Sequence, residues 1–321
     1  MKSICLILPW FGGPFKNYFH LFLESCKNNP TINWLIFTDS TQSYNYPENV
    51  KIVKCSFEYV RERIQKIFDF EISLNRPYKL CDFKPTYGEV FHEELKHYDY
   101  WGYCDCDLIF GNIRSFVTDE ILEKYDKIFS RGHLTIYRNI NEVNSFYKTV
   151  QYPFYKDVFS SSKSFAFDEW GGVSAAWSDT GKLYYDNLVM DDIRVGFKKF
   201  RITKEISGFG SPYHNNINES KKFKRMKDIF YVYDKGKLYR RWMVCGNSQE
   251  EEVLYVHFQK RAMGVVGTHF EKELYFIVNN FFCDEFDALE YNLKKIHKFC
   301  LHDILLDFKF LAVKLFRTFV N

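Results

Sequence analysis

The chain has 321 residues, 46% hydrophobic and 26% charged, and this ordinary globular composition excludes a disordered or a collagen-like chain. Its 44 basic and 41 acidic side chains leave a formal net charge of +3, and nucleic-acid binding, which normally needs a concentrated basic face, is not predicted. Aromatic residues make up 20% of the chain, more than a core usually needs, which indicates that some line a ligand groove or a membrane-facing surface.

The N-terminal part of the chain alternates between short apolar runs and amphipathic stretches. Apolar runs at 3–9, 34–37 and 50–55 predict buried strands, and the stretches at 16–28 and 57–74 predict helices. Strands that alternate with helices indicate an α/β domain with a mostly parallel sheet. In such sheets ligands bind beyond the carboxyl ends of the strands, so the residues after each strand are site candidates.

The pattern continues through the middle of the chain and then changes. We predict a helix over 82–97, strands over 100–103 and 127–130, and helices at about 141–150 and 168–182. From about 184 to 256, short alternating runs predict antiparallel strands added to the parallel core, with a hairpin turn at 234–237. We predict one continuous catalytic domain over 1–270 and a helical extension over 271–321.

Cysteine spacing and the N-terminus bear on localisation. The nine cysteines are spread along the chain, which predicts buried free thiols in a reducing compartment rather than a disulfide framework. The N-terminal apolar run is short and broken by Pro9 and Gly12, so no signal peptide is predicted. No apolar window of about 18 residues is present. We expect a cytoplasmic protein, soluble or peripheral on the inner face of the cytoplasmic membrane.

The strongest local signal is Asp105-Cys106-Asp107, at the end of the strand predicted over 100–103. Residues two apart in a strand point to the same side, so both carboxylates can face one space. A buried pair of like charges is costly unless it is neutralised, and Mg²⁺ or Mn²⁺ suits hard oxygen ligands. The alternative is a pair of solvated acids, because this short motif is common by chance.

The context of this motif resembles bacterial glycosyltransferases of the GT-A type that assemble surface polysaccharide, as in capsule or lipopolysaccharide. The resemblance covers roughly residues 3–260 and depends on LPWFG, LIFTDS, PYKLCDFKPTYGEVF, YWGYCDCDLIFGNI, SRGHLTIYRN and FDEW, in this order. It implies a GT-A-like fold, a Rossmann-like nucleotide-binding mixed sheet flanked by helices. It also implies transfer of a sugar from a nucleotide-sugar donor, first of all a UDP-sugar, to a hydroxyl of a glycan or lipid-linked glycan acceptor.

The resemblance also implies a metal site. Asp105 and Asp107 would hold the cation against the donor diphosphate, and a third ligand usually comes from a His near the end of the catalytic domain. His257 ends an apolar strand where such a ligand is expected, with a structural histidine as the alternative; its imidazole favours Mn²⁺ over Mg²⁺. Lys260 and Arg261 are candidates for contacts to diphosphate oxygens, although a solvated face explains them equally well.

Further donor contacts are predicted near the strand ends. The loop Pro9-Trp10-Phe11-Gly12 offers an aromatic face for a base and a glycine for close backbone approach, without the pattern of NAD-type sites. Asp39 is a candidate for base or ribose contacts, or a turn cap. Asp82 and Lys84 are candidates near a helix start, where Asp82 could equally be an N-cap.

The segments beyond the metal motif supply the remaining candidates. In similar enzymes the strand that contains His133 helps to line the sugar pocket. Asp168 or Glu169 would serve as the carboxylate general base that an inverting transferase needs. Acids in a first helical turn also favour the helix dipole without any catalytic purpose, and a retaining mechanism would give the same residue a sugar-binding role.

The C-terminal stretch and two rival functions complete the expectations. Residues 298–321 are mainly apolar with basic residues interspersed, which predicts a helix that lies in a membrane interface or packs on the catalytic core. One rival is another metal-using α/β enzyme, a nucleotidyltransferase or phosphoesterase, which usually calls for more metal carboxylates. The other is a non-enzymatic glycan-binding or assembly protein, whose binding surface would be the aromatic excess.

Overall fold

The computed structural model describes residues 1–169, 172–180, 184–186, 190–193, 196–197, 200, 202, 227–244, 247–259, 261–267 and 270–284. It divides into two compact units. Met1–Cys106 and Ile113–Leu188 form the N-terminal unit, and Asp107–Asn112, Val189–Lys204 and the chain from Asn216 form the C-terminal unit. Lys260 and the C-terminal stretch 298–321 lie outside the described residues.

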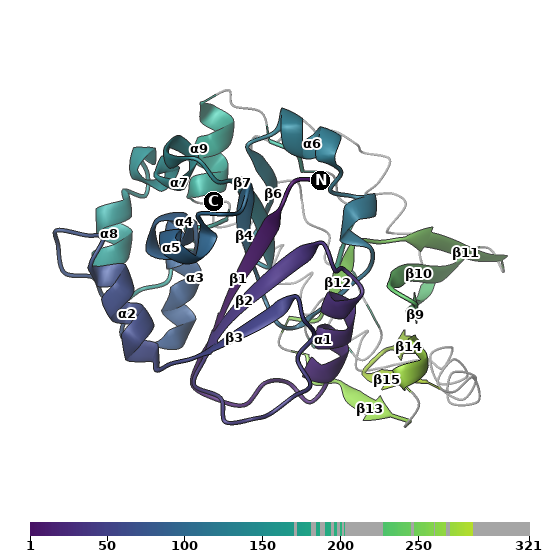
Figure 1. Cartoon of the computed structure of the whole chain (residues 1–321). Coiled ribbons are helices and arrows are strands. Elements are labelled where there is room, and N and C mark those ends of the chain that lie inside the picture. The colour runs from purple at the N-terminus through teal and green to yellow at the C-terminus, as the bar shows by residue number, and fades with distance from the viewer. Residues whose placement is uncertain are drawn as a thin grey trace, which may run out of the picture. The chain divides into compact units, whose positions relative to one another are not determined.

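A six-stranded sheet organises the N-terminal unit, in the order β3-β2-β1-β4-β7-β6. The strands are β1 (Ile4–Trp10), β2 (Ile32–Thr38), β3 (Val50–Lys54), β4 (Tyr100–Cys104), β6 (Lys127–Arg131) and β7 (Leu134–Arg138). The first four in this order are parallel and lie side by side in Figure 1, while β7 is antiparallel to both β4 and β6. The order 3-2-1-4 is that of a Rossmann half-sheet, so the predicted mixed α/β sheet is confirmed.

Short helices cover this sheet. The α-helices are α1 (Phe19–Lys27), α2 (Phe57–Gln65), α3 (Leu80–Phe83), α4 (Tyr87–Val90), α5 (His92–Leu95), α6 (Asp119–Lys124), α7 (Asn141–Asn144), α8 (Tyr155–Ser160) and α9 (Val173–Asp179). Four 3₁₀ turns lie at Pro77–Lys79, Lys84–Thr86, Ile113–Ser115 and Phe146–Thr149. The single helix predicted over 82–97 is wrong: it is broken into pieces because Pro85 has no N–H to continue an α-helix.

One face of the sheet packs on α2 to α5 and on the segment from α7 to α9. Alternate strand residues point into this core: Cys5, Ile7, Leu35, Phe37, Trp101 and Tyr103. Aromatic side chains fill much of this core, among them Phe83, Tyr87, Phe91, Phe159 and Trp177. Part of the aromatic excess is therefore a packing feature of the N-terminal unit.

The C-terminal unit is built from two sheets. A three-stranded sheet has the order β5-β12-β8, formed by β5 (Leu108–Phe110), β12 (Tyr255–His257) and β8 (Asp191–Asp192). A six-stranded sheet has the order β11-β10-β9-β14-β15-β13, formed by β9 (Lys227–Asp234), β10 (Lys237–Val244), β11 (Asn247–Glu252), β13 (Gly264–Val266), β14 (Leu274–Val278) and β15 (Phe281–Cys283), with a 3₁₀ turn at Phe270–Lys272. The predicted hairpin is confirmed: Lys235 and Gly236 both have positive φ, as a two-residue turn requires.

Two expectations for the C-terminal part are corrected. The antiparallel strands form a sheet of their own rather than an addition to the parallel core. The helix predicted from 271 is wrong over 274–283, where β14 and β15 pair around a turn at Asn279, whose φ is +51°. Because β14 also pairs with β9, the predicted boundary at 270/271 falls inside this sheet.

Two further findings concern the thiols and the membrane. Among the described residues, no cysteine forms a disulfide. Within the same part of the chain, no helix has the length and apolar character that crossing a membrane would require.

Lys127 gives the N-terminal unit a pH-dependent stability. The side chain is fully buried and donates to the carbonyl of Phe129 and to Ser174 Oγ, and burial lowers its pKa to about 7. Above that pH the folded protein leaves Lys127 neutral, while the unfolded chain still binds the proton up to about pH 10. This residue's contribution to stability therefore rises between about pH 7 and 10, by up to about 1.4 kcal/mol per pH unit.

Thermal or urea unfolding of wild type and Lys127→Met at pH 7.5 and 9.5 tests whether the contribution of Lys127 to stability rises with pH. Other groups titrate in the same range, so the difference between the two proteins isolates Lys127. We expect the variant to lose stability relative to wild type as the pH rises. A difference that stays constant with pH would show that Lys127 is charged in the folded state.

Candidate functional site

The carboxyl ends of β1 and β4 form the topological switch point of the N-terminal sheet. From β1 the chain continues to β2 and β3 on one side, and β4 pairs with the other side of β1. Connections leave in opposite directions at such a point, which opens a crevice outside the strand ends. Trp10 ends β1 and Asp105 directly follows β4, so two predicted site segments lie at this edge.

The loop after β1 is shaped by Asp39. Gly12 has a φ of +81°, which favours glycine, and its N–H donates to both carboxylate oxygens of Asp39 at 3.2 and 3.3 Å. The indole N–H of Trp10 donates to the carbonyl of Gly13, and its ring stacks on Phe15. These contacts support the turn-cap interpretation of Asp39, and donor contacts by this loop stay a prediction.

Lys84 connects three parts of the predicted site. Its ammonium donates to Asp105 Oδ1 at 2.8 Å and to the carbonyl of Gly132 at 2.6 Å, and it lies 4.0 Å from Asp168 Oδ2. Burial alone would lower the pKa of Lys84, but the charges of Asp105 and Asp168 more than offset this and raise it. The backbone N–H of Asp105 donates to the carbonyl of His133, which ties β4 to the turn between β6 and β7.

Asp168 and Glu169 face this cluster from the segment before α9. Asp168 is 2% exposed, and its Oδ2 has no hydrogen-bond partner among the described residues. Burial raises the pKa of Asp168 well above its ordinary value, Lys84 opposes this, and Glu169 and Asp105 add to it. Glu169 Oε1 accepts the backbone N–H of Gly132 at 2.8 Å. Both acids precede α9, which begins at Val173, so they do not occupy the first helical turn that the pattern predicted.

Gly132 is a site residue that the sequence reasoning missed. A Cβ at this position would lie 2.3 Å from Glu169 Oε1 and 3.0 Å from Asp168 Oδ2. Its place between the strand predicted at 127–130 and the strand that contains His133 was the available signal, since a glycine beside strands often marks close backbone approach.

We expect Gly132→Ala to lower the free energy of unfolding by about 1–3 kcal/mol, because the methyl group would displace carboxylates that are already packed against the backbone. Gly13→Ala is the matched control, since a Cβ there meets nothing within 4 Å. Urea unfolding of both variants measures the effect. Equal stability of the two would mean that the acids do not approach Gly132 closely in solution.

Asp82 is not available for a donor contact, and that prediction is corrected. The side chain is fully buried, forms an ion pair with Lys79 at 2.8 Å, and accepts the backbone N–H groups of Phe165 and Phe167. Nor is it an N-cap, because it lies inside α3. Its carboxylate instead fixes the segment that leads directly to Asp168.

The strand argument for the acidic motif is also corrected. β4 ends at Cys104 and β5 begins at Leu108, so Asp105 and Asp107 lie in the connection and strand alternation does not apply to them. Arg261, predicted as a diphosphate contact or part of a solvated face, is 5% exposed and donates to Asn280 Oδ1.

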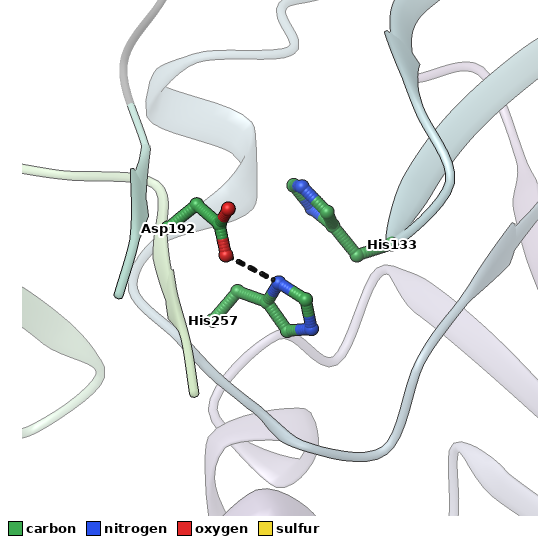
Figure 2. A group of neighbouring side chains, drawn as sticks. All are labelled: His133, Asp192 and His257. Carbon is green, nitrogen blue, oxygen red and sulfur yellow. Dashed lines mark hydrogen bonds and ion pairs between the residues drawn. The ribbon is translucent and has the colours of Figure 1, made fainter. Parts of the chain in front are cut away.

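The C-terminal unit brings together Asp107 and His257, as the sequence predicted for two of the metal ligands. His257 Nε2 lies 3.3 Å from Asp107 Oδ1, and Nδ1 lies 2.8 Å from Asp192 Oδ1. Figure 2 shows the contact with Asp192. Burial alone would lower the pKa of His257, but Asp107 and Asp192 raise it to about 10. Asp192 was not predicted, because its two-residue strand has no periodic pattern.

This donor set fits a divalent cation. Two neighbouring ligands of an octahedral cation with bonds of about 2.1 Å lie about 3.0 Å apart, close to the observed 3.3 Å between His257 Nε2 and Asp107 Oδ1. An imidazole nitrogen beside carboxylate oxygens suits a transition-metal ion better than Ca²⁺ or Mg²⁺, which prefer oxygen ligands.

Residues 6–285 match the family described as "Family of unknown function (DUF6625)", and the chain belongs to this family. No curated protein matches the chain. Three solved structures with partial similarity are glycosyltransferases. The galactosyltransferase LgtC, in complex with donor and acceptor sugar analogs, is 8% identical over 50% of this chain and 66% of its own, with a TM-score of 0.30. An active-site mutant of LgtC is 7% identical over 59% of this chain and 75% of its own, with a TM-score of 0.34. Mouse xyloside xylosyltransferase 1 is 7% identical over 61% of this chain and 89% of its own, with a TM-score of 0.36.

Proposed function

We propose that the protein is a metal-dependent glycosyltransferase of GT-A-like architecture, which transfers a sugar from a nucleotide-sugar donor to a hydroxyl of a glycan acceptor. The observation that supports it most is the buried carboxyl of Asp168, next to Lys84 and Asp105, at the switch point of a Rossmann-like sheet. A sheet edge of the kind that binds nucleotides and a carboxylate able to act as general base are two parts that an inverting transferase uses.

Each group has a proposed task in the reaction. Asp107 and His257 would hold Mn²⁺, and Asp105, two residues earlier in the chain, would be the third ligand. When bound, the cation neutralises the negative charge that develops on the leaving diphosphate. Asp168 accepts the proton of the acceptor hydroxyl as its oxygen forms the new bond to the anomeric carbon, and the electron pair of the broken bond leaves with the diphosphate.

Mn²⁺-dependent hydrolysis of nucleotide sugars by the full-length protein tests this function. We expect UDP and free sugar from at least one UDP-sugar, lost on chelation of the metal. Asp107→Ala should abolish the activity with folding intact, while Glu250→Gln, at an exposed position of β11 in the same unit, should keep it.

The products separate the rival functions. A phosphoesterase or nucleotidyltransferase would cleave within the diphosphate and release UMP and a sugar phosphate. A glycan-binding or assembly protein would bind sugars without any turnover. Either result in place of UDP and free sugar would contradict the proposal.

The acceptor and the location are proposed on the sequence alone. We propose a surface-glycan or lipid-linked acceptor, with residues 298–321 as a membrane-associating helix of a cytoplasmic protein. Deletion of 298–321 should then move the protein from the membrane fraction to the soluble fraction. A distribution that does not change on deletion would refute this attachment.

A further inference from the structure

The two nitrogens of His257 have different surroundings within the C-terminal unit. Nδ1 lies 2.8 Å from Asp192 Oδ1, an ordinary hydrogen-bond length, and Nε2 lies 3.3 Å from Asp107 Oδ1, near the spacing of two ligands on one cation. A metal-bound histidine usually donates its other ring N–H to a carboxylate, which fixes the tautomer and the ring orientation. Asp192 occupies that place.

Asp192 is itself held from two directions. β8 runs parallel to β12, and Asp192 is the register partner of His257. Strand pairing therefore fixes the position of the Asp192 backbone relative to His257. The side-chain amide of Gln259 donates to both oxygens of Asp192, at 2.9 and 2.8 Å. The preceding residue, Asp191, makes its contacts with Arg240 and Tyr231 instead. Neighbouring acids on one short strand thus have separate partners.

The backbone of Gln259 adds a second observation. Its φ is +53°, in the left-handed region that costs a residue with a side chain about 1–2 kcal/mol. Strain of this kind persists where surrounding contacts enforce it, and it is frequent at functional sites. Here the strained residue is the one whose amide binds both oxygens of Asp192.

We propose that Asp192, fixed by Gln259, is the positioning residue that presents Nε2 of His257 for cation binding. Nδ1–H donates to Asp192, which leaves the lone pair of Nε2 on the side of Asp107. Neither Asp192 nor Gln259 is a ligand in this scheme. The inference deepens the proposed function and rests on the metal site proposed there.

Mn²⁺ binding by the full chain, followed by electron paramagnetic resonance of free and bound Mn²⁺, tests the positioning role. In wild type we expect a nitrogen modulation in the spin-echo signal from the His257 imidazole. Asp192→Ala should weaken Mn²⁺ binding by about 10–100-fold and remove this modulation. Asp192→Asn, which keeps a carbonyl acceptor, should fall between Asp192→Ala and wild type.

Two matched variants separate positioning from folding. Asp191→Asn disturbs the same strand and should lower the melting temperature while Mn²⁺ affinity stays unchanged. Gln259→Gly relieves the left-handed backbone but deletes the amide, so the melting temperature should stay or rise while Mn²⁺ affinity falls several-fold. Loss of affinity in Asp191→Asn equal to that in Asp192→Ala would overturn the inference.

The outcomes also separate this inference from the proposed function. If wild-type Mn²⁺ shows nitrogen modulation that persists in Asp192→Ala at unchanged affinity, the positioning role fails while the metal site stands. If wild type binds Mn²⁺ without any nitrogen modulation, His257 is not a ligand, and both the proposed ligand set and the positioning role are wrong.

Discussion

Asp168→Asn is expected to lower kcat by about 10²–10⁴-fold and to leave Mn²⁺ affinity unchanged. Asn has the size of Asp but cannot accept the proton of an acceptor hydroxyl, and general bases contribute about this factor. Burial already raises the pKa of Asp168 and disfavours its charged form, so the neutral amide should keep or raise the melting temperature. Steady-state kinetics and thermal unfolding of the same preparation check both effects.

The pH dependence of kcat/KM tests whether Asp168 acts as a base. A base must be ionised to act, so kcat/KM should rise as the pH passes upward through the raised pKa of Asp168. Asp168→Asn should lack this rise. Glu169→Gln is the matched control: its side-chain oxygen can still accept the N–H of Gly132, and it should keep most of the turnover. If Glu169→Gln is inactive and Asp168→Asn is active, Glu169 is the base.

The centre of the parallel sheet was predictable because β1, β2 and β4 are buried on both faces along most of their length. Residues 4–8 of β1 and 34–37 of β2 read as continuous apolar runs. The rule that ligands bind beyond the carboxyl ends of parallel strands then points to Asp105 and to the loop after β1. Lys84 was predicted as a candidate near a helix start, and Asp168 and Glu169 as an acidic pair able to supply the general base of an inverting transferase.

The missed features depend on contacts between distant parts of the chain. Asp192 and His257 are 65 residues apart, and a two-residue strand leaves no periodic signal. The buried role of Asp82 follows from backbone N–H groups at Phe165 and Phe167, which no local pattern reveals. Asn279 is a turn signal within an apolar stretch that also fits a helix. The stretch forms strands because β14 pairs with β9, a contact that the local sequence does not reveal.

Lys84→Met is expected to lower the free energy of unfolding by about 2 kcal/mol at neutral pH and to reduce turnover strongly. Removing one partner of a buried ion pair usually costs about 3–5 kcal/mol, and less is expected here because Asp105 is 37% exposed and water replaces part of the lost contact. The carbonyl of Gly132 also loses its ammonium donor. Lys84→Arg should recover little, because a planar guanidinium does not reproduce three convergent contacts of an ammonium.

A double-mutant cycle identifies the reason for this loss. If Lys84 serves to neutralise Asp168, then Asp168→Asn removes the charge that needs it, and Lys84→Met should cost less in that background than in wild type. The same logic predicts that the loss shrinks at acidic pH, where Asp168, whose pKa is raised, is protonated first. Urea unfolding of the four proteins at pH 5 and 7.5 measures both. Additive effects at both pH values would mean that Lys84 Nζ and Asp168 Oδ2, 4.0 Å apart, are close but not energetically coupled. The charge of Lys84 would then have no effect on the raised pKa of the proposed base.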